Sequence, residues 1–178
     1  MSSQSGIRGE RGTVTADPFE RLFLAEYGRV VAIAHRVLAE RSEAEDVAQE
    51  VFLDFHRRHD PEADYAAPWL HRAATHTALN RIRSHRRRQR RELASADLQS
   101  DAPDPQQVVE VMEERQRVRQ ALRRMPRKAA SVLTLRYSGL SYVEVGAALG
   151  VSTGQIGTLL RRAEQALRKE MNHNATPQ

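Results

Sequence analysis

The chain has no cysteine, 5% aromatic residues and no long run of apolar residues. Without cysteine it can form neither a disulfide nor a thiolate zinc site. No apolar stretch approaches the roughly 20 residues that a membrane-spanning helix requires, so we expect no membrane insertion. A glycine-rich phosphate loop, a nucleophile motif and a pair of catalytic carboxylates are also missing. The sequence therefore predicts a protein that is not an enzyme and uses no cofactor.

Seven histidines remain as candidate metal ligands. His56 and His59 straddle the end of a predicted helix, whereas His71 and His76 are five residues apart and so lie off a common helix face. Neither pair has the cysteine or carboxylate partners that complete a preformed site. We expect no metal site.

Basic residues outnumber acidic residues by 28 to 23, which gives a formal net charge of +5. This balance favours a polyanionic partner, and nucleic acid is the leading candidate. Residues 1–16 are rich in Ser, Gly and Arg and contain no apolar segment, which indicates a disordered tail rather than a secretory signal. We therefore expect a cytoplasmic protein that binds nucleic acid.

Apolar residues recur at helical spacing through most of the chain, and no segment alternates as a β-strand does. The prediction is an all-α fold. Asp17 and Pro18 mark the start of a first helix of about six turns. Ser42 with Glu45 predicts the cap of a second helix. A third is expected to begin near Trp69.

The composition changes abruptly at residues 92–107, which are acidic and rich in Ser, Ala and Pro. Such a composition is typical of a flexible linker. Helical spacing resumes at Val108, and Pro126 predicts the start of a further helix. The predicted organisation is therefore a tail at 1–16, a small helical domain at 17–91, the linker at 92–107, a second helical domain at 108–172 and a tail at 173–178.

The second predicted helix is the acidic part of this basic chain. Asp46, Gln49 and Glu50 lie outside the apolar stripe formed by Val47 and Val51. A phosphate backbone would repel these carboxylates, so we expect them to face a protein. The alternative is a solvated charged face, which is how most such surfaces behave.

The third predicted helix places His76, Asn80, Arg83 and Arg87 on one face, because they follow one another at steps of four, three and four. Asn80 is the best candidate for reading an exposed base edge, and the arginines, Arg72 and Arg81 included, suit phosphates. Tyr65 precedes the helix and could stack on an unpaired base. Trp69 is expected in the core.

Residues 141–168 predict a helix-turn-helix. Ser141 with Glu144 and Ser152 with Gln155 are capping-box pairs, and Gly150 between them suits a left-handed turn. Ile156, Leu160, Ala163 and Leu167 would face the core. The residues expected to meet DNA are Ser152, Thr153, Gln155, Thr158, Leu159, Arg161 and Arg162. An ordinary pair of packed helices is the alternative.

The three motifs together resemble those of bacterial sigma-70 initiation factors of the small extracytoplasmic-function (ECF) group. Residues 43–55 resemble the family's core-binding segment, 68–88 its minus-ten helix and 140–167 its minus-thirty-five reader. The resemblance implies a dissociable, non-catalytic subunit of two helical domains, sigma regions 2 and 4. Its partners would be core RNA polymerase, through the beta-prime clamp helices and the beta flap, promoter DNA, and in some relatives an anti-sigma factor.

The chain also departs from this family pattern. Gln155, Gly157, Leu159 and Glu164 stand where the family usually has Thr, Lys, Arg and Arg, and Thr75 and His76 replace Arg and Asn. The missing cations lead us to expect weak or altered minus-thirty-five binding. The competing hypothesis is a stand-alone helix-turn-helix regulator that binds operators as a dimer, although no coiled-coil heptads supply a dimer interface.

Overall fold

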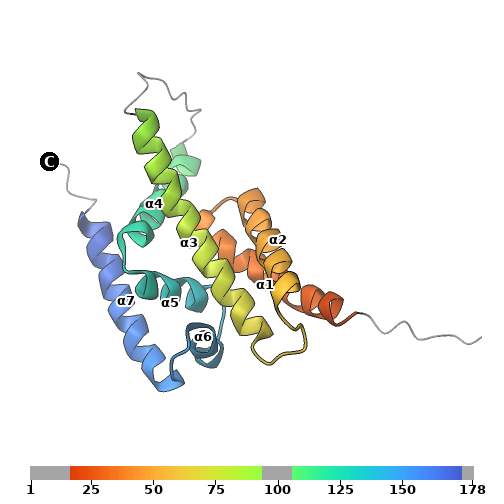
Figure 1. Cartoon of the computed structure of the whole chain (residues 1–178). Helices are drawn as coiled ribbons and strands as arrows, with labels where there is room; N and C mark the ends of the chain where they lie inside the picture. Colours follow the sequence, from red (N-terminus) through yellow and green to blue (C-terminus); the bar gives the residue numbers. More distant parts are fainter. Residues whose placement is uncertain (1–16, 94–105, 174–178) are drawn as a thin grey trace, which may run out of the picture.

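The computed structural model describes residues 17–93 and 106–173, with side chains for residues 17–84 and 113–172. Its helices are α1 (Pro18–Leu38), α2 (Arg41–Arg58), α3 (Ala66–Leu93), α4 (Gln106–Arg124), α5 (Arg127–Tyr137), α6 (Tyr142–Leu149) and α7 (Thr153–His173), shown in Figure 1. The described residues contain no strand, so the all-α prediction is confirmed. Residues 1–16 and 174–178 of the predicted tails and residues 94–105 of the predicted linker lie outside the described residues, whereas residues 92–93 and 106–107 of the linker and His173 belong to helices.

The helix starts follow local chemistry, with one correction. Pro18 opens α1 after Asp17, as predicted. The prediction that Ser42 caps the second helix is wrong, because the Glu40 carboxylate accepts hydrogen bonds from the backbone N–H groups of Ser42 and Glu43. The Ser42 hydroxyl itself donates to Glu40, and this bond is the main cause that lowers the pKa of Glu40. Glu40 is therefore the N-cap of α2, and the Ser42 hydroxyl is hydrogen-bonded to it.

Helix α3 begins three residues before Trp69. Pro68 lies in its first turn, where a missing N–H costs no helical hydrogen bond. The Trp69 N–H donates to the Tyr65 carbonyl at 2.8 Å, which closes that turn. Trp69 is half-buried and its ring packs against Phe55 and His59, in agreement with the core prediction.

Helices α1, α2 and α3 form the first helical group around a core that includes Ile33, Phe55, Leu70 and Leu79. Helices α4, α5, α6 and α7 form the second, in which α4 packs mainly on α7 and Leu135, Leu140 and Ile156 are fully buried. No helix in the described part of the chain has the length and apolar character needed to cross a membrane.

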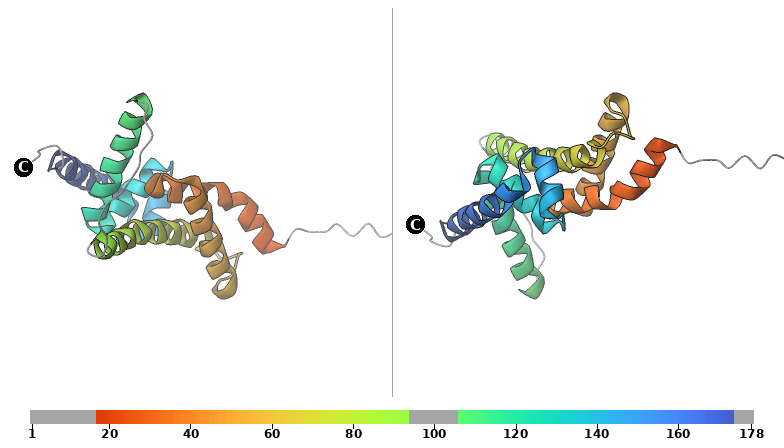
Figure 2. Two further views of the ribbon diagram at one scale, coloured as in Figure 1. Left: turned by 90° about the horizontal axis from the view of Figure 1, so that it is seen from above. Right: turned by 90° about the horizontal axis from the view of Figure 1, so that it is seen from below.

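The two groups pack directly against each other. Helix α5 contacts α6 and α7 on one side and α1 and α3 on the other, so all residues from 130 to 135 are buried. The views in Figure 2 show α3 running alongside the second group rather than apart from it. One continuous apolar core therefore spans both halves of the chain.

Candidate functional site

Helix α2 presents its acidic residues on the side opposite its buried stripe. Asp46, Gln49 and Glu50 are exposed, whereas Val47 and Val51 are buried. The Glu50 carboxylate is not free, because Arg81 of α3 donates to it at 2.9 Å. The predicted protein-binding face is thus accessible, and one of its carboxylates is oriented by α3.

Leu53 belongs to the same surface, although the sequence motifs did not single it out. Its side chain is 56% exposed, next to the acidic face and on the rim of a groove of about 370 Å³ between α2 and α3. Leu53 lies off the stripe formed by Val47, Val51 and Phe55, and that offset was the available signal. Leu53 therefore adds an exposed apolar side chain beside the carboxylates.

The α3 face predicted to read DNA exists, and the second helical group covers part of it. Arg127, at the start of α5, donates from Nη2 to Oδ1 of Asn80 at 2.6 Å. Arg83 donates to the Met125 carbonyl at 3.0 Å. His76 lies half-buried on the same face, with Arg83 and Arg127 as charged neighbours. The side chain of Arg87 lies outside the described residues.

Burial and positive charge dominate the electrostatics of this face. Burial is the main cause that lowers the pKa of His76, and the guanidinium groups of Arg127, Arg72 and Arg83 lower it further. Burial also lowers the pKa of Arg83, with Arg127 as the second cause. The guanidinium groups therefore lie close together on the face that is predicted to contact phosphates, and they favour the neutral form of His76.

Of the remaining residues of the predicted minus-ten group, Arg72 lies near His76, one turn before it, whereas Arg81 and Tyr65 lie away from this face. Arg72 is exposed, and Arg81 points to α2, where it pairs with Glu50 and donates to the Glu43 carbonyl. Tyr65 is 47% exposed in the turn before α3, with its ring edge-on to His59 at 5.8 Å. Its open ring remains available for stacking.

The helix-turn-helix has the predicted local geometry. Ser141 and Glu144 form a complete capping box, and Gly150 ends α6 with φ 65°. A Cβ on Gly146 would lie 2.9 Å from the Val151 carbonyl oxygen, so the turn requires glycine there. After the turn, the Gln155 N–H donates to the Ser152 carbonyl at 3.0 Å. This bond joins two backbone groups, so both side-chain bonds of the second capping box stay a prediction.

Helix α7 is amphipathic as predicted. Ile156 and Ala163 are buried, and Leu160 and Leu167 are half-buried against the core. Every residue of the predicted minus-thirty-five group has an accessible side chain. These are Ser152, Thr153, Gln155, Thr158, Arg161 and Arg162, which are exposed, and Leu159, which is half-buried.

One of the unusual residues of α7, Glu164, has a structural explanation, whereas nothing in the structure explains Gly157. Glu164 accepts a hydrogen bond from the Tyr137 hydroxyl at 2.8 Å, which ties α7 to the end of α5 and is the main cause that raises the pKa of Tyr137. Gly157 faces Tyr142, and a Cβ there would lie 3.8 Å from Tyr142 Cε2, an ordinary contact. A larger side chain would therefore fit at Gly157.

An ion pair also joins the two helical groups. Arg29 of α1 donates to the Glu144 carboxylate of α6 at 2.6 Å. Hydrogen bonds from Ser141 are the main causes that lower the pKa of Glu144, and Arg29 adds to them. The capping box that starts the helix-turn-helix is thus also a contact with the first group. Among the described residues, no cluster of three or more His, Asp or Glu side chains could hold a metal ion.

Comparison with known proteins matches both helical groups to one family. Residues 22–88 match Sigma-70 region 2, and residues 115–167 match Sigma-70, region 4. The chain belongs to the sigma-70 family. It is an RNA polymerase sigma factor of the ECF type, a class that directs polymerase to promoters and starts transcription. The alternative of a stand-alone operator-binding regulator is not favoured.

Individual proteins that resemble this chain are sigma factors too. SigE of Mycolicibacterium smegmatis, an ECF RNA polymerase sigma factor, is 32% identical over 79% of this chain, which spans 56% of the length of SigE. The RNA polymerase sigma factor NccH of Alcaligenes xylosoxydans xylosoxydans is 30% identical over 79% of this chain and 80% of its own length. The sigma factor RpoE, in a complex with the anti-sigma factor NepR from Bartonella quintana, shares the fold with a TM-score of 0.51 at 20% identity, over 86% of this chain and 96% of RpoE.

Proposed function

We propose that this sigma factor binds core RNA polymerase through the acidic face of α2 and recognises promoter DNA with α3 and α7. The observation that carries the proposal is the exposure of Asp46, Gln49 and Glu50 beside the exposed Leu53. Carboxylates at this position repel DNA and suit a basic protein surface. The partner surface on polymerase would be the beta-prime clamp helices, and the beta flap would receive the second helical group.

Asn80 is the base-reading residue of this proposal, with His76, Arg83 and Arg87 along the same helix face. Because Arg127 donates to the Asn80 amide oxygen, this hydrogen bond must break before that oxygen can accept from a base. Tyr65 supplies a stacking face, and Arg72 and Arg81 contact phosphates. Arg81 would have to leave Glu50 to do so, and polymerase binding at Glu50 would release it.

On α7, Gln155 and Thr158 are closest to base edges, whereas Arg161 and Arg162 contact phosphates. Ser152, Thr153 and Leu159 complete this surface. The function requires no catalysis, and it places the protein in the cytoplasm with polymerase and the chromosome. An anti-sigma factor is a further proposed partner, supported by the complex in which the structurally similar RpoE is found.

Binding to core polymerase tests the proposal. The double variant Asp46→Ala with Glu50→Ala should weaken binding of purified core polymerase at least about tenfold, or about 1.4 kcal/mol. A matched control removes two exposed carboxylates elsewhere, Glu20→Ala with Glu113→Ala, and should bind as the unchanged chain does. Equal affinity of all three proteins would contradict the proposed interface.

A further inference from the structure

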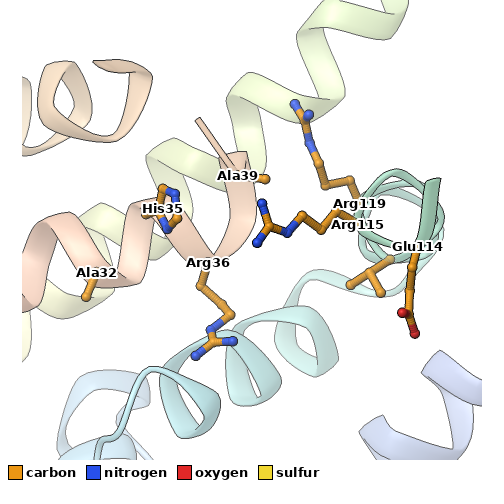
Figure 3. A pocket seen from close by; sticks show the side chains of 8 residues that line it. Ala32, His35, Arg36, Ala39, Glu114, Arg115 and Arg119 are labelled. Atoms are coloured by element: carbon orange, nitrogen blue, oxygen red, sulfur yellow. The ribbon is translucent and has the colours of Figure 1, made fainter. Parts of the chain in front are cut away.

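A groove of about 510 Å³ lies between α1 and α4, at the junction of the two helical groups. Its volume is in the range of small-molecule sites. Basic side chains line it from both sides, His35 and Arg36 from α1 and Arg115 and Arg119 from α4. Figure 3 shows side chains from both helices extending into the space between them.

The arginines of the groove lack a countercharge among the described residues. None of Arg36, Arg115 and Arg119 forms an ion pair with a carboxylate that the structure describes. Glu114 lines the groove too, but its carboxylate points away from the guanidinium groups of Arg115 and Arg119 (Figure 3). The groove therefore has an excess of positive charge.

The arrangement on α4 is unfavourable without an anion. Arg115 and Arg119 are four residues apart, a spacing at which like charges destabilise a helix. Both positions lack a carboxylate three or four residues away in the sequence. Arg36, by contrast, lies in the last turn of α1, where the helix dipole favours a cation. The dipole accounts for Arg36 but not for the pair on α4.

We propose that this groove binds a small anion that carries two or more phosphate groups. Guanidinium groups make paired, charge-assisted hydrogen bonds to phosphate oxygens, and two helices supply them from opposite sides. Because α1 and α4 belong to different helical groups, the bound anion bridges the halves. It thereby stabilises the packed arrangement in which Arg127 occupies Asn80.

Calorimetric titration of the full chain with sodium tripolyphosphate at constant ionic strength tests the site. Replacement of Arg36→Gln together with Arg115→Gln should weaken binding at least about tenfold. A control that removes two exposed cations elsewhere, Lys128→Gln with Arg168→Gln, should retain the original affinity. An equal loss of affinity in both double variants would overturn the proposal, because it would show that net charge alone attracts the anion. No binding of tripolyphosphate to the unchanged chain would overturn it too. Circular dichroism confirms that each variant is folded.

Two further readouts separate a bridging small anion from the phosphates of DNA. Spin labels can be attached to cysteines introduced at Leu24 and Gln165, which are both exposed. Tripolyphosphate should shift the distance distribution toward the packed population when the groove is intact. It should not do so in the groove double, Arg36→Gln with Arg115→Gln. An unchanged distance would overturn the bridging. Binding of a short DNA duplex should change less than twofold in the groove double. An equal loss of duplex binding would instead assign the groove to DNA.

Discussion

Replacing Arg29 and Arg127 with alanine tests whether polar contacts hold the two helical groups together. Arg29 pairs with Glu144 at 2.6 Å, with side chains 43% and 37% exposed, and an exposed pair of this kind contributes about 0.2–1 kcal/mol. The bond from Arg127 to Asn80 adds about 1 kcal/mol. Together they contribute about 1–2 kcal/mol, so the double variant should raise the ratio of separated to packed molecules roughly 5- to 30-fold.

The assay is the distance distribution between spin labels on cysteines introduced at Leu24 and Gln165. The chain has no native cysteine, so labelling is confined to these sites. A matched control, Arg41→Ala with Arg58→Ala, removes two ion pairs within α2 and should leave the distribution unchanged. An unchanged distance distribution in the Arg29 and Arg127 double would refute a role of these contacts in holding the groups together. We also expect this double to bind single-stranded promoter DNA more tightly, because Asn80 is released.

Three further predictions follow from the same structure. Burial lowers the folded-state pKa of His76 below the unfolded value near 6.5, so its contribution to stability is present above that pH and is lost as the pH falls through the folded-state pKa. In urea unfolding, His76→Gln should therefore reduce the drop in the free energy of unfolding between pH 7 and pH 5. An unchanged drop would contradict this prediction. Phe55→Ala should lower the free energy of unfolding by about 3–5 kcal/mol, since Phe55 is fully buried, and a loss below about 1 kcal/mol in urea unfolding would be inconsistent with that core. Gly157→Lys with Leu159→Arg should tighten duplex binding and steepen its salt dependence by up to about 0.9 for each new phosphate contact; an unchanged slope in a salt titration would remove α7 from the DNA interface.

The helix-turn-helix could be predicted closely because its determinants are local. Ser141, Glu144 and Gly150 act within one or two turns of their own positions, and the structure has the capping box and the left-handed residue where the pattern indicated them. The cap of α2 was assigned to the wrong residue for a related reason. Glu40 and Ser42 both lie at the helix start, and the geometry of the preceding Ala39, with φ 59°, lets the glutamate reach the free N–H groups.

The packing of the two helical groups could not be predicted in the same way. Arg127 and Asn80 are 47 residues apart, and nothing local distinguishes Arg127 from any other exposed arginine at a helix start. One signal was present in α5, where residues 130–135 contain no charged side chain. A helical segment that is uncharged on all sides is typically buried on all sides, and this segment of α5 packs between α7 and the first group. The spacing therefore predicted that His76, Asn80 and Arg83 share a helix face, but not that the second helical group covers part of that face.

Run-off transcription tests the central claim most directly. Purified core polymerase would be incubated with fragmented genomic DNA from the source organism, with the unchanged chain or with the Asp46→Ala and Glu50→Ala double, and transcript starts would be mapped. We expect discrete transcript starts that depend on the unchanged chain, share two spaced upstream motifs and are lost with the double variant. Duplex binding without any stimulation of transcription would contradict it and favour an operator-binding regulator.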